Sequence, residues 1–483
     1  MNANQCALLG GIFGTLLLAT SGCVLAPEGL KDQQKAVERA GLPYTRPVAK
    51  RDMPYVPFQP TWQQVLHRAF LADGDLEIAY DQWANAVARV REMGAYPNTP
   101  LAPGFSYLFS PGNMTAWNRT TLTAGPDPQT DLSFPGKSAQ AGRTAYDEAL
   151  AAAKRFEAAK FDLQKRVLSG YFDLVAMDQK IQIQRENVEL LKVMDEEAQT
   201  RVQAGGAQQE ILKSQIDLKF AENDLAAMES THETMLTGLN ALMGRNPEAA
   251  ILAPEQMPAP RPLPADDETL LTIAVDNNPE LAALAEEAQG RQDALELARM
   301  QYIPDFNPMA AITGSVSQSV GVVVILPFTT PKIAAQVDEA EAALAESQAL
   351  ARQTKEDRAA SFVTALLSLR DDERAGDLLE KEVLPRAKES ARIARDSYTT
   401  GSMGFGDVID AQRTLLQVRT MIVDARMDRE KRLAELEQLA GTDLTTLQPL
   451  PFYLLHPRPM RLHGPGPTPK PSTRLSPSEI FVQ

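Results

Sequence analysis

Residues 210–215 read Glu-Ile-Leu-Lys-Ser-Gln, and residues 407–412 read Asp-Val-Ile-Asp-Ala-Gln. The offset that aligns them, 412 − 215 = 197, also places Leu218 on Leu415 and Gly244 on Gly441. A match of this length predicts that one architectural unit is used twice along the chain. Each unit is interpreted as a short helix, a β-like stretch and two long helices that are joined by a Gly-rich turn.

The first unit opens with a helix at Thr61, which has the spacing of a capping box with Gln64. We expect this helix to reach about Gly94, with a break near residues 73–74. Residues 96–135 are rich in Pro, Gly, Thr and Asn, and alternating runs at 105–109 and 115–118 predict strands with one wet and one apolar face. An irregular loop is the alternative for that segment.

A very long helix follows over residues 138–203, which contain no proline and consist mainly of good helix formers. At 1.5 Å per residue this helix would be about 100 Å long. Because that length exceeds a compact core, the helix has to pair along its length with others. Residues 204–206 interrupt it, and a returning helix is predicted to run to about Met243.

The second unit has the same signals. Asn278-Pro279 fits an N-cap followed by proline at the first helical position. Residues 305–327 form its β-like region, in which 320–326 is the clearest strand and 310–317 its antiparallel partner.

The second long helix is predicted from 330 to about 399, and Pro385 should kink or interrupt it. Its return helix ends near Leu439, with Gly441 as the C-cap. Together these boundaries define a signal peptide (1–22), an extended N-terminal tether (23–60), repeat 1 (61–245), a Pro-rich linker (246–266), repeat 2 (267–442) and a Pro-rich C-terminal tail (443–483).

The N-terminus has the features of an export signal. Residues 8–19 are apolar but too short to span a bilayer. The sequence Ala-Thr-Ser-Gly-Cys at 19–23 resembles a bacterial lipobox, which predicts a lipoprotein with palmitate at Cys23, held in outer membrane lipid. Ordinary cleavage without lipidation is the alternative. The other cysteine, Cys6, leaves with the signal, so no disulfide framework is expected.

The composition excludes several classes of function. A net charge of −15 argues against nucleic acid as a partner, because phosphate binding needs clustered Lys and Arg. The sequence contains no Gly-rich phosphate loop, nucleophile elbow or paired histidine ligands. We therefore expect no enzyme, no cofactor and no metal site.

A family resemblance rests on the second repeat. Tyr398 is followed by Gly401, then by Asp407 six residues beyond the glycine and by Asp410 three further on. This order, with the internal repeat and the lipobox, resembles the TolC-like outer membrane factor family from about residue 61 to 441. The step at 134–137 and the stretch 294–306 are similar to the heavy-metal-efflux branch of that family.

The resemblance implies a mainly α fold with a small β part. In the TolC-like architecture, a homotrimer forms a long coiled-coil α-barrel and a shared 12-stranded β-barrel. It also implies a location in the outer membrane of a Gram-negative-type bacterium, with extension into the periplasm. The implied partners are a periplasmic adaptor (membrane fusion) protein and an inner-membrane pump.

Two sets of site residues follow from the resemblance. The hairpin turns are similar to the tips that dock an adaptor, and their residues are Ala204, Gly205, Gly206, Gly401, Ser402, Met403 and Gly404. Asp407 and Asp410 match the acidic positions that ring the closed periplasmic aperture. Since i and i+3 share a helix face, threefold symmetry would gather six carboxylates. The alternative is that Asp407 caps a helix and Asp410 is solvated.

The expected function is therefore a passive outer membrane exit duct of a tripartite efflux or secretion system. A lipid-anchored periplasmic coiled-coil adaptor or scaffold is the alternative. Metal-cation efflux is favoured for the cargo, and drugs or secreted proteins stay open.

Overall fold

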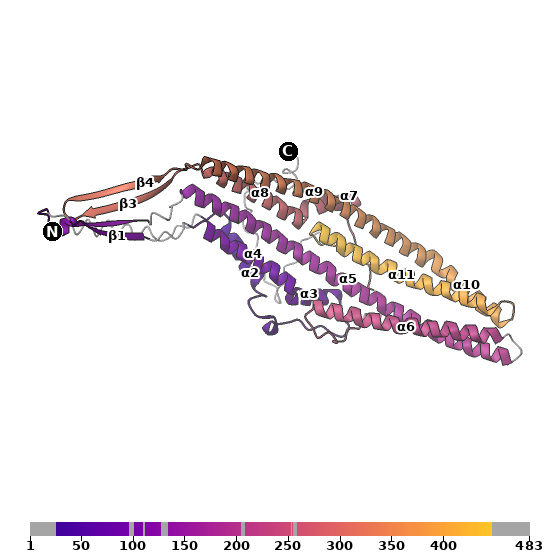
Figure 1. The fold of residues 1–483 in the computed structure, drawn as a ribbon. Helices are drawn as coiled ribbons and strands as arrows, with labels where there is room; N and C mark the ends of the chain where they lie inside the picture. Colours follow the sequence, from indigo (N-terminus) through magenta and orange to yellow (C-terminus); the bar gives the residue numbers. More distant parts are fainter. Residues whose placement is uncertain are drawn as a thin grey trace, which may run out of the picture.

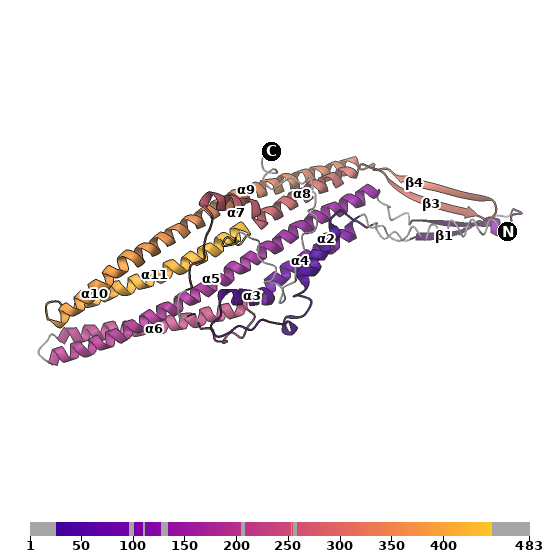
Figure 2. The same ribbon diagram turned by 180° about the vertical axis from the view of Figure 1, so that it is seen from behind.

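The computed structural model describes residues 26–95, 101–109, 112–126, 134–203, 208–252, 254 and 258–446. The molecule is elongated, with a small sheet at one end and the ends of two helical hairpins at the other (Figures 1 and 2). No helix among these residues combines the length and the apolar character needed to cross a lipid bilayer.

The prediction that residues 23–60 form an extended tether is wrong for part of that length. α2 (Leu30–Gly41) is a helix, and η1 (Val48–Lys50) is a 3-10 turn. α2 packs against α4 (Gly74–Met93), and its apolar residues Leu30, Ala36, Val37 and Ala40 contact the core. Their near-helical spacing explains why this polar, Pro-bearing segment folds locally.

The predicted break in the next helix is confirmed. α3 (Trp62–Ala72) begins at the Thr61 capping box, in which the Thr61 N–H donates to Gln64 Oε1 at 2.9 Å. α4 follows after the single residue Asp73, whose carboxylate accepts a hydrogen bond from Leu76 N at 2.9 Å. Asp73 therefore ends one helix and caps the next.

Four antiparallel strands form one sheet in the order β1-β2-β3-β4. They are β1 (Leu101–Tyr107), β2 (Thr120–Pro126), β3 (Asp305–Thr313) and β4 (Ser317–Ile325). The predicted antiparallel pairing in the second unit is confirmed, with Ala310 opposite Val320. The predicted bounds are wrong, because β3 starts at 305 and ends at 313, and β4 already starts at 317. β2 pairs with β3 and so joins the two units, with Thr121 opposite Thr313.

The prediction of a strand at 115–118 is wrong. Residues 117–119 form the 3-10 turn η2 between β1 and β2. The Asn118 side chain accepts a hydrogen bond from Ser315 N at 3.0 Å, which ties this turn to the β3–β4 turn. Four alternating residues are too few to distinguish a strand from such a turn.

The sheet is fastened to the helices by a partly buried ion pair. Lys137 Nζ lies 2.9 Å from each carboxylate oxygen of Asp305, and Phe134 N donates to the same carboxylate at 2.7 Å. The contact joins the start of the first long helix to the start of β3. A displacement of either unit here would separate Lys137 from Asp305 and leave a partly buried charge without its partner.

Long helices make up the rest of the molecule. The first hairpin is α5 (Pro135–Gln203) with α6 (Gln208–Leu242). In the second unit, α7 (Asp267–Asn277) and α8 (Pro279–Met300) precede β3. The second hairpin comprises α9 (Thr330–Leu378), the π-helical segment η3 (Leu379–Val383), α10 (Leu384–Thr399) and α11 (Phe405–Ala440). The predicted interruption near Pro385 is confirmed, because η3 ends two residues before it.

α5 is the helix around which the others pack, since it contacts α3, α4, α6, α8 and α11. Its middle is buried on several sides, at Leu163, Gln164, Val167, Leu168, Tyr171, Phe172, Leu174, Val175 and Ala176. Toward the hairpin end its buried residues reduce to a narrower stripe, at Asn187, Val188, Leu191, Met194, Asp195 and Ala198. The packing therefore thins from the middle of the molecule to its end.

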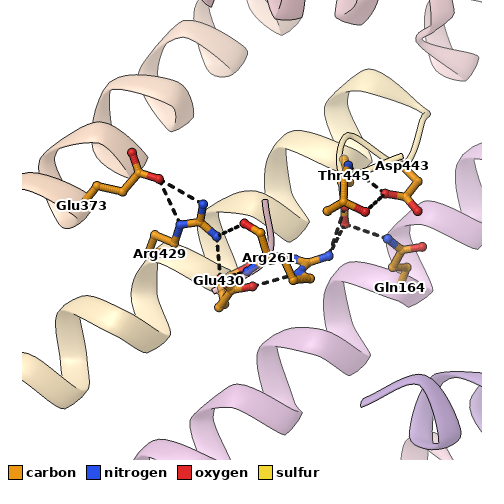
Figure 3. Close-up of polar contacts among 8 residues, drawn as sticks. Gln164, Arg261, Glu373, Arg429, Glu430, Asp443 and Thr445 are labelled. Carbon is orange, nitrogen blue, oxygen red and sulfur yellow. Dashed lines mark hydrogen bonds and ion pairs between the residues drawn. The ribbon is translucent and has the colours of Figure 1, made fainter. Parts of the chain in front are cut away.

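A buried network of charges ties the inter-unit linker to α11 and α5 (Figure 3). Arg261 Nε donates to Glu430 Oε2 at 2.8 Å, and its Nη1 donates to Glu437 Oε2 at 3.0 Å. Arg429 donates to the Arg261 carbonyl at 2.7 Å and to Glu430 Oε1 at 2.6 Å. Gln164 of α5 donates to Glu437 Oε2 at 2.8 Å. We call these five residues the polar junction.

Glu437 depends on Arg261 for its charge. Glu437 is fully buried, and burial raises its pKa to about 7 against the opposing effects of Arg261 and Gln164. Burial alone would lower the pKa of Arg261, yet Glu437 and Glu430 together raise it. Removing one partner of such a group leaves an uncompensated buried charge, which is strongly destabilising.

We expect Gly441→Ala to lower the free energy of unfolding by about 2 kcal/mol or more. Gly441 ends α11 at φ +62°, and an added Cβ would lie 2.3 Å from Pro279 Cδ and 2.7 Å from the Asn277 carbonyl oxygen. The matched control is Gly238→Ala inside α6, where a Cβ meets nothing within 4 Å. Thermal melts followed by helical circular dichroism compare the two. Equal melting temperatures would show that the left-handed cap is dispensable.

Candidate functional site

The predicted tip residues of the second hairpin, 401–404, fall at the end of the molecule remote from the sheet, where the two hairpins end side by side (Figure 1). Gly401, Ser402, Met403 and Gly404 form the turn between α10 and α11. Ala204, Gly205 and Gly206 follow the end of α5 in the sequence and lie outside the described residues. Cys23, near the N-terminus, also lies outside them.

The turn at 400–404 is held by its own backbone. Gly401 has φ +75°, which favours glycine. Ser402 N donates to the Ser397 carbonyl at 2.9 Å, and Ser402 Oγ donates to the same oxygen at 3.0 Å. The turn is consequently an ordered, exposed feature at the end of the second hairpin.

Met403 contributes to a shallow groove between α10 and α11. Ile393, Ala394 and Ala411 line its apolar part, and Arg386, Glu389 and Asp407 are among its polar residues. The groove opens at the exposed end of the hairpin, so the tip offers a partner an apolar strip with charged borders.

Asp407 and Asp410 are both exposed on the first turns of α11. Asp407 Oδ2 accepts a hydrogen bond from Gly404 N at 3.1 Å, so Asp407 caps the helix. Asp410 is 73% exposed, and its carboxylate lies 3.9 Å from Arg413 Nη1. The helix-capping role of Asp407 is therefore observed, and it does not compete with a role for the exposed charge.

Arg201 joins the two hairpins at their ends. Its guanidinium lies 3.8 Å from the centre of the Tyr398 ring, and Nη2 donates to the Tyr398 carbonyl at 2.5 Å. The Tyr398 hydroxyl donates to Glu210 of α6 at 3.4 Å. Burial raises the pKa of Tyr398, so its phenol stays neutral and able to donate.

An apolar cluster lies behind this contact and includes residues of both hairpins. Tyr398 and Phe405 pack edge to face with ring centres 5.8 Å apart. We call the set the tip cluster: Val188, Leu191, Met194, Ala198, Ala221, Ala394, Tyr398, Phe405, Val408 and Ile409. Arg413 adds an ion pair to Asp217 of α6 at 2.5 Å. The tip is thus closed by one small cluster and a few polar links.

The sequence analysis missed Arg201, Asp217 and Arg413. A signal for Arg201 was available, since 398 − 201 = 197 is the offset of the repeat, so Arg201 and Tyr398 occupy equivalent positions in the two units. Asp217 and Arg413 carried no comparable signal. Both are single charges on helices that are rich in charge.

The described residues contain no group of three or more His, Cys, Asp or Glu side chains placed to hold a metal ion. Asp407 and Asp410 are therefore exposed charges at the start of α11.

Comparison with known proteins agrees with this fold. The family profile described as "Outer membrane efflux protein" matches residues 270–442. The chain is 23% identical over 267 residues to the cobalt-zinc-cadmium resistance protein CzcC of Cupriavidus metallidurans, an alignment that covers 53% of this chain and 62% of CzcC. The chain thus matches less than two thirds of the length of that relative.

Solved structures share the architecture. The outer membrane protein VceC of Vibrio cholerae superposes with a TM-score of 0.66 at 18% identity, covering 79% of this chain and 96% of VceC. The open state of the MtrE outer membrane channel of Neisseria gonorrhoeae gives a TM-score of 0.62 at 18% identity, covering 79% and 89%. The second unit of this chain is thus similar to the outer membrane efflux protein family, and the whole chain shares the fold of these solved structures.

We expect Arg201→Met to loosen the tip while leaving the fold intact. The substitution keeps the apolar stem but removes the cation over Tyr398 and the hydrogen bond to its carbonyl. Amide hydrogen exchange of residues 398–411 should become about tenfold faster, because such contacts contribute on the order of 1–2 kcal/mol.

The control is Arg185→Met. Arg185 is on the same helix but pairs with Glu229 within the first hairpin. Unaltered exchange at 398–411 in Arg201→Met would mean that Arg201 does not hold the tip closed.

Proposed function

We propose that this chain is a passive exit duct in the outer membrane, through which an inner-membrane pump and a periplasmic adaptor expel their substrate. The match of residues 270–442 to the outer membrane efflux protein family and the fold shared with solved outer membrane proteins support the proposal. The observation that carries it is a four-stranded sheet with exposed apolar side chains at one end of helical hairpins about 100 Å long.

The sheet exposes too much apolar surface for a single copy in water. Val320 is 88% exposed and Phe105 70%, and Val322, Val324 and Phe306 are each more than 40% exposed. β1 and β4 each pair on one side only within the described sheet. Copies of the chain that pair at these edges would satisfy their backbone groups, and three copies would supply a 12-stranded barrel.

The helical layer supports the same arrangement. Within the described chain α6 packs mainly on α5, and it carries an exposed apolar stripe at Leu212, Ile216 and Phe220, four residues apart. α9, at the other side of the layer, exposes Val363 and Leu367. Side-by-side copies would bury both stripes and close the helices into an α-barrel with an internal twofold repeat in each protomer.

The acids of the tip give the proposed duct its gate. In a threefold ring Asp407 and Asp410 of each copy would surround the axis, where carboxylates repel anions and attract cations. The tip turns and the groove beside Met403 would receive the adaptor. The likeness to CzcC, named for cobalt, zinc and cadmium resistance, favours metal cations as cargo, and organic substrates are the alternative.

Opening would require the two hairpins to separate at the tip cluster. Among the described residues, a few polar links and the tip cluster oppose that motion, so docking of an adaptor could supply enough free energy to drive it. Because the proposal is a conduit, the energy of transport would come from the pump.

Electron microscopy of the protein extracted in detergent from outer membranes tests the duct against a lipid-anchored periplasmic scaffold. We expect end-on images of a threefold ring around a lumen. A monomer or a solid rod would favour the scaffold.

The gate is tested by the double substitution Asp407→Asn, Asp410→Asn. Asparagine retains an acceptor for Gly404 N, so the cap persists while the charge is lost. In planar bilayers we expect the closed channel to conduct more and to lose its preference for cations. The control for net charge is Glu233→Gln with Glu339→Gln, two exposed acids distant in sequence from the tip. Equal conductance of all three proteins would rule out the aperture assignment.

A further inference from the structure

A recess lies between three helices in the half of the molecule nearer the sheet. α5 runs between α4 and α8 and packs against both (Figures 1 and 2). Residues of all three helices line the recess, and its volume is about 380 Å³. That volume is within the range of cavities that hold small organic molecules.

Small side chains account for the hollow. Ala86 of α4, Ala152 of α5 and Ala294 of α8 are among the residues that line it, and we call these three the alanine floor. Gly290 brings α8 close to α5, since a Cβ at this position would lie 3.4 Å from Asp147 Cβ. The helices are thus close together while the side chains between them are short, so the floor of the recess is apolar and open.

Two arginines beside the alanine floor share one carboxylate. Arg155 Nη2 donates to Glu287 Oε2 at 2.5 Å and so joins α5 to α8. Arg291 Nη2 lies 3.7 Å from the other oxygen of Glu287, which is too far for a hydrogen bond. The Arg291 guanidinium makes no hydrogen bond to the described residues, and its side chain is 49% exposed. Arg291 therefore has donors available for a ligand.

The charges around the recess favour an anion. Glu148 also lines the recess, but its carboxylate lies 3.4 Å from Arg89 Nη1 of α4, which compensates it. Glu287 compensates one of the two arginines that remain. These three arginines and two glutamates sum to one positive charge, in a chain whose net charge is −15. A ligand with a negative group and an apolar body would match both the arginine and the alanine floor.

We propose that this recess binds an organic anion, a carboxylate attached to an aromatic ring, with the carboxylate on Arg291 and the ring on the alanine floor. A guanidinium can donate two parallel hydrogen bonds to one carboxylate, so Arg291 would also orient the ligand. A flat ring suits a floor of methyl groups. The recess is built by one copy of the chain, so the inference goes beyond the proposed duct and does not depend on it.

Photolabelling with 4-azidobenzoate tests the site in the full-length protein. The protein is irradiated in detergent with this probe, and labelled peptides are identified by mass spectrometry. We expect labels in the three segments that line the recess, 82–86, 144–155 and 287–294, and an excess of benzoate should remove them. 4-Azidobenzylamine, which has a similar ring and the opposite charge, should label these segments about fivefold less, because its cation would face a guanidinium.

Two kinds of substitution separate the roles of charge and shape. Arg291→Gln should lower labelling by 4-azidobenzoate about fivefold. The matched control is Arg299→Gln, which removes the same charge further along α8, where Arg299 pairs with Glu341 at 2.9 Å, and it should leave labelling unchanged. Ala86→Leu should abolish labelling, because the larger side chain fills the floor. Ala294→Met tests the same point if Ala86→Leu does not accumulate.

Three results would overturn the proposal: labels spread evenly over the chain, equal labelling by the two probes, or equal losses in Arg291→Gln and Arg299→Gln. Conductance is measured separately. A protein that conducts but is not labelled in the recess would keep the duct and refute the site. A protein that is labelled there but encloses no lumen would keep the site and refute the duct.

Discussion

A helix of 69 residues cannot bury its apolar surface by itself, and the rest of this structure follows from that constraint. α5 extends over about 100 Å, so different elements have to cover it at different heights: α4 and α8 toward the sheet, α3 and the C-terminal half of α11 at the middle, and α6 toward the tip. Stability is consequently distributed along an axis. The middle of α5 is covered on several sides, whereas its end is covered by little more than one stripe.

The polar junction belongs to the part of α5 that is covered most completely. Ion pairs in such a place are a poor source of stability, because desolvation offsets most of their attraction. Their contribution is to fix the register in which α11 packs on α5. A leucine could slide along α5 by a turn at little cost, but Glu437 can accept from both Gln164 and Arg261 at one register only. The polar junction therefore fixes the register in which the two units pack. Through Arg261, the linker contributes to this packing as well as connecting the units.

Much of the architecture could be predicted from local sequence signals. Residues such as Asn278, Pro385 and Gly441 act on the backbone through their own chemistry, so their effects are visible without a fold. The helix at 30–41 was missed because its stability comes from packing on α4. The polar sequence of this segment does not indicate such a contact. The brief alternation at 115–118 was misleading because a 3-10 turn satisfies it equally well.

The charged contacts were the least accessible to sequence reasoning. Arg261 lies in a Pro-rich linker, where an arginine is ordinarily solvated, and its partners are 169 and 176 residues away. Arg201 and Tyr398 are different, because they share one position in the repeated unit. In a duplicated chain whose halves pack side by side, equivalent positions near the shared axis are neighbours. The repeat offset itself is thus a contact prediction.

The same reasoning explains why an opening at the tip would cost less free energy than an opening at the middle. Two units that derive from one pattern have matching apolar stripes, and such stripes associate wherever they are long enough to exclude water. At the tip the stripes shorten to the tip cluster, and partly exposed ion pairs replace buried ones. An opening at the tip breaks contacts that hydrogen bonds to water can partly replace. An opening at the polar junction would separate the buried carboxylates of Glu430 and Glu437 from their hydrogen-bond donors, which costs more free energy. This difference in free energy favours a change of shape at the tip over one at the polar junction.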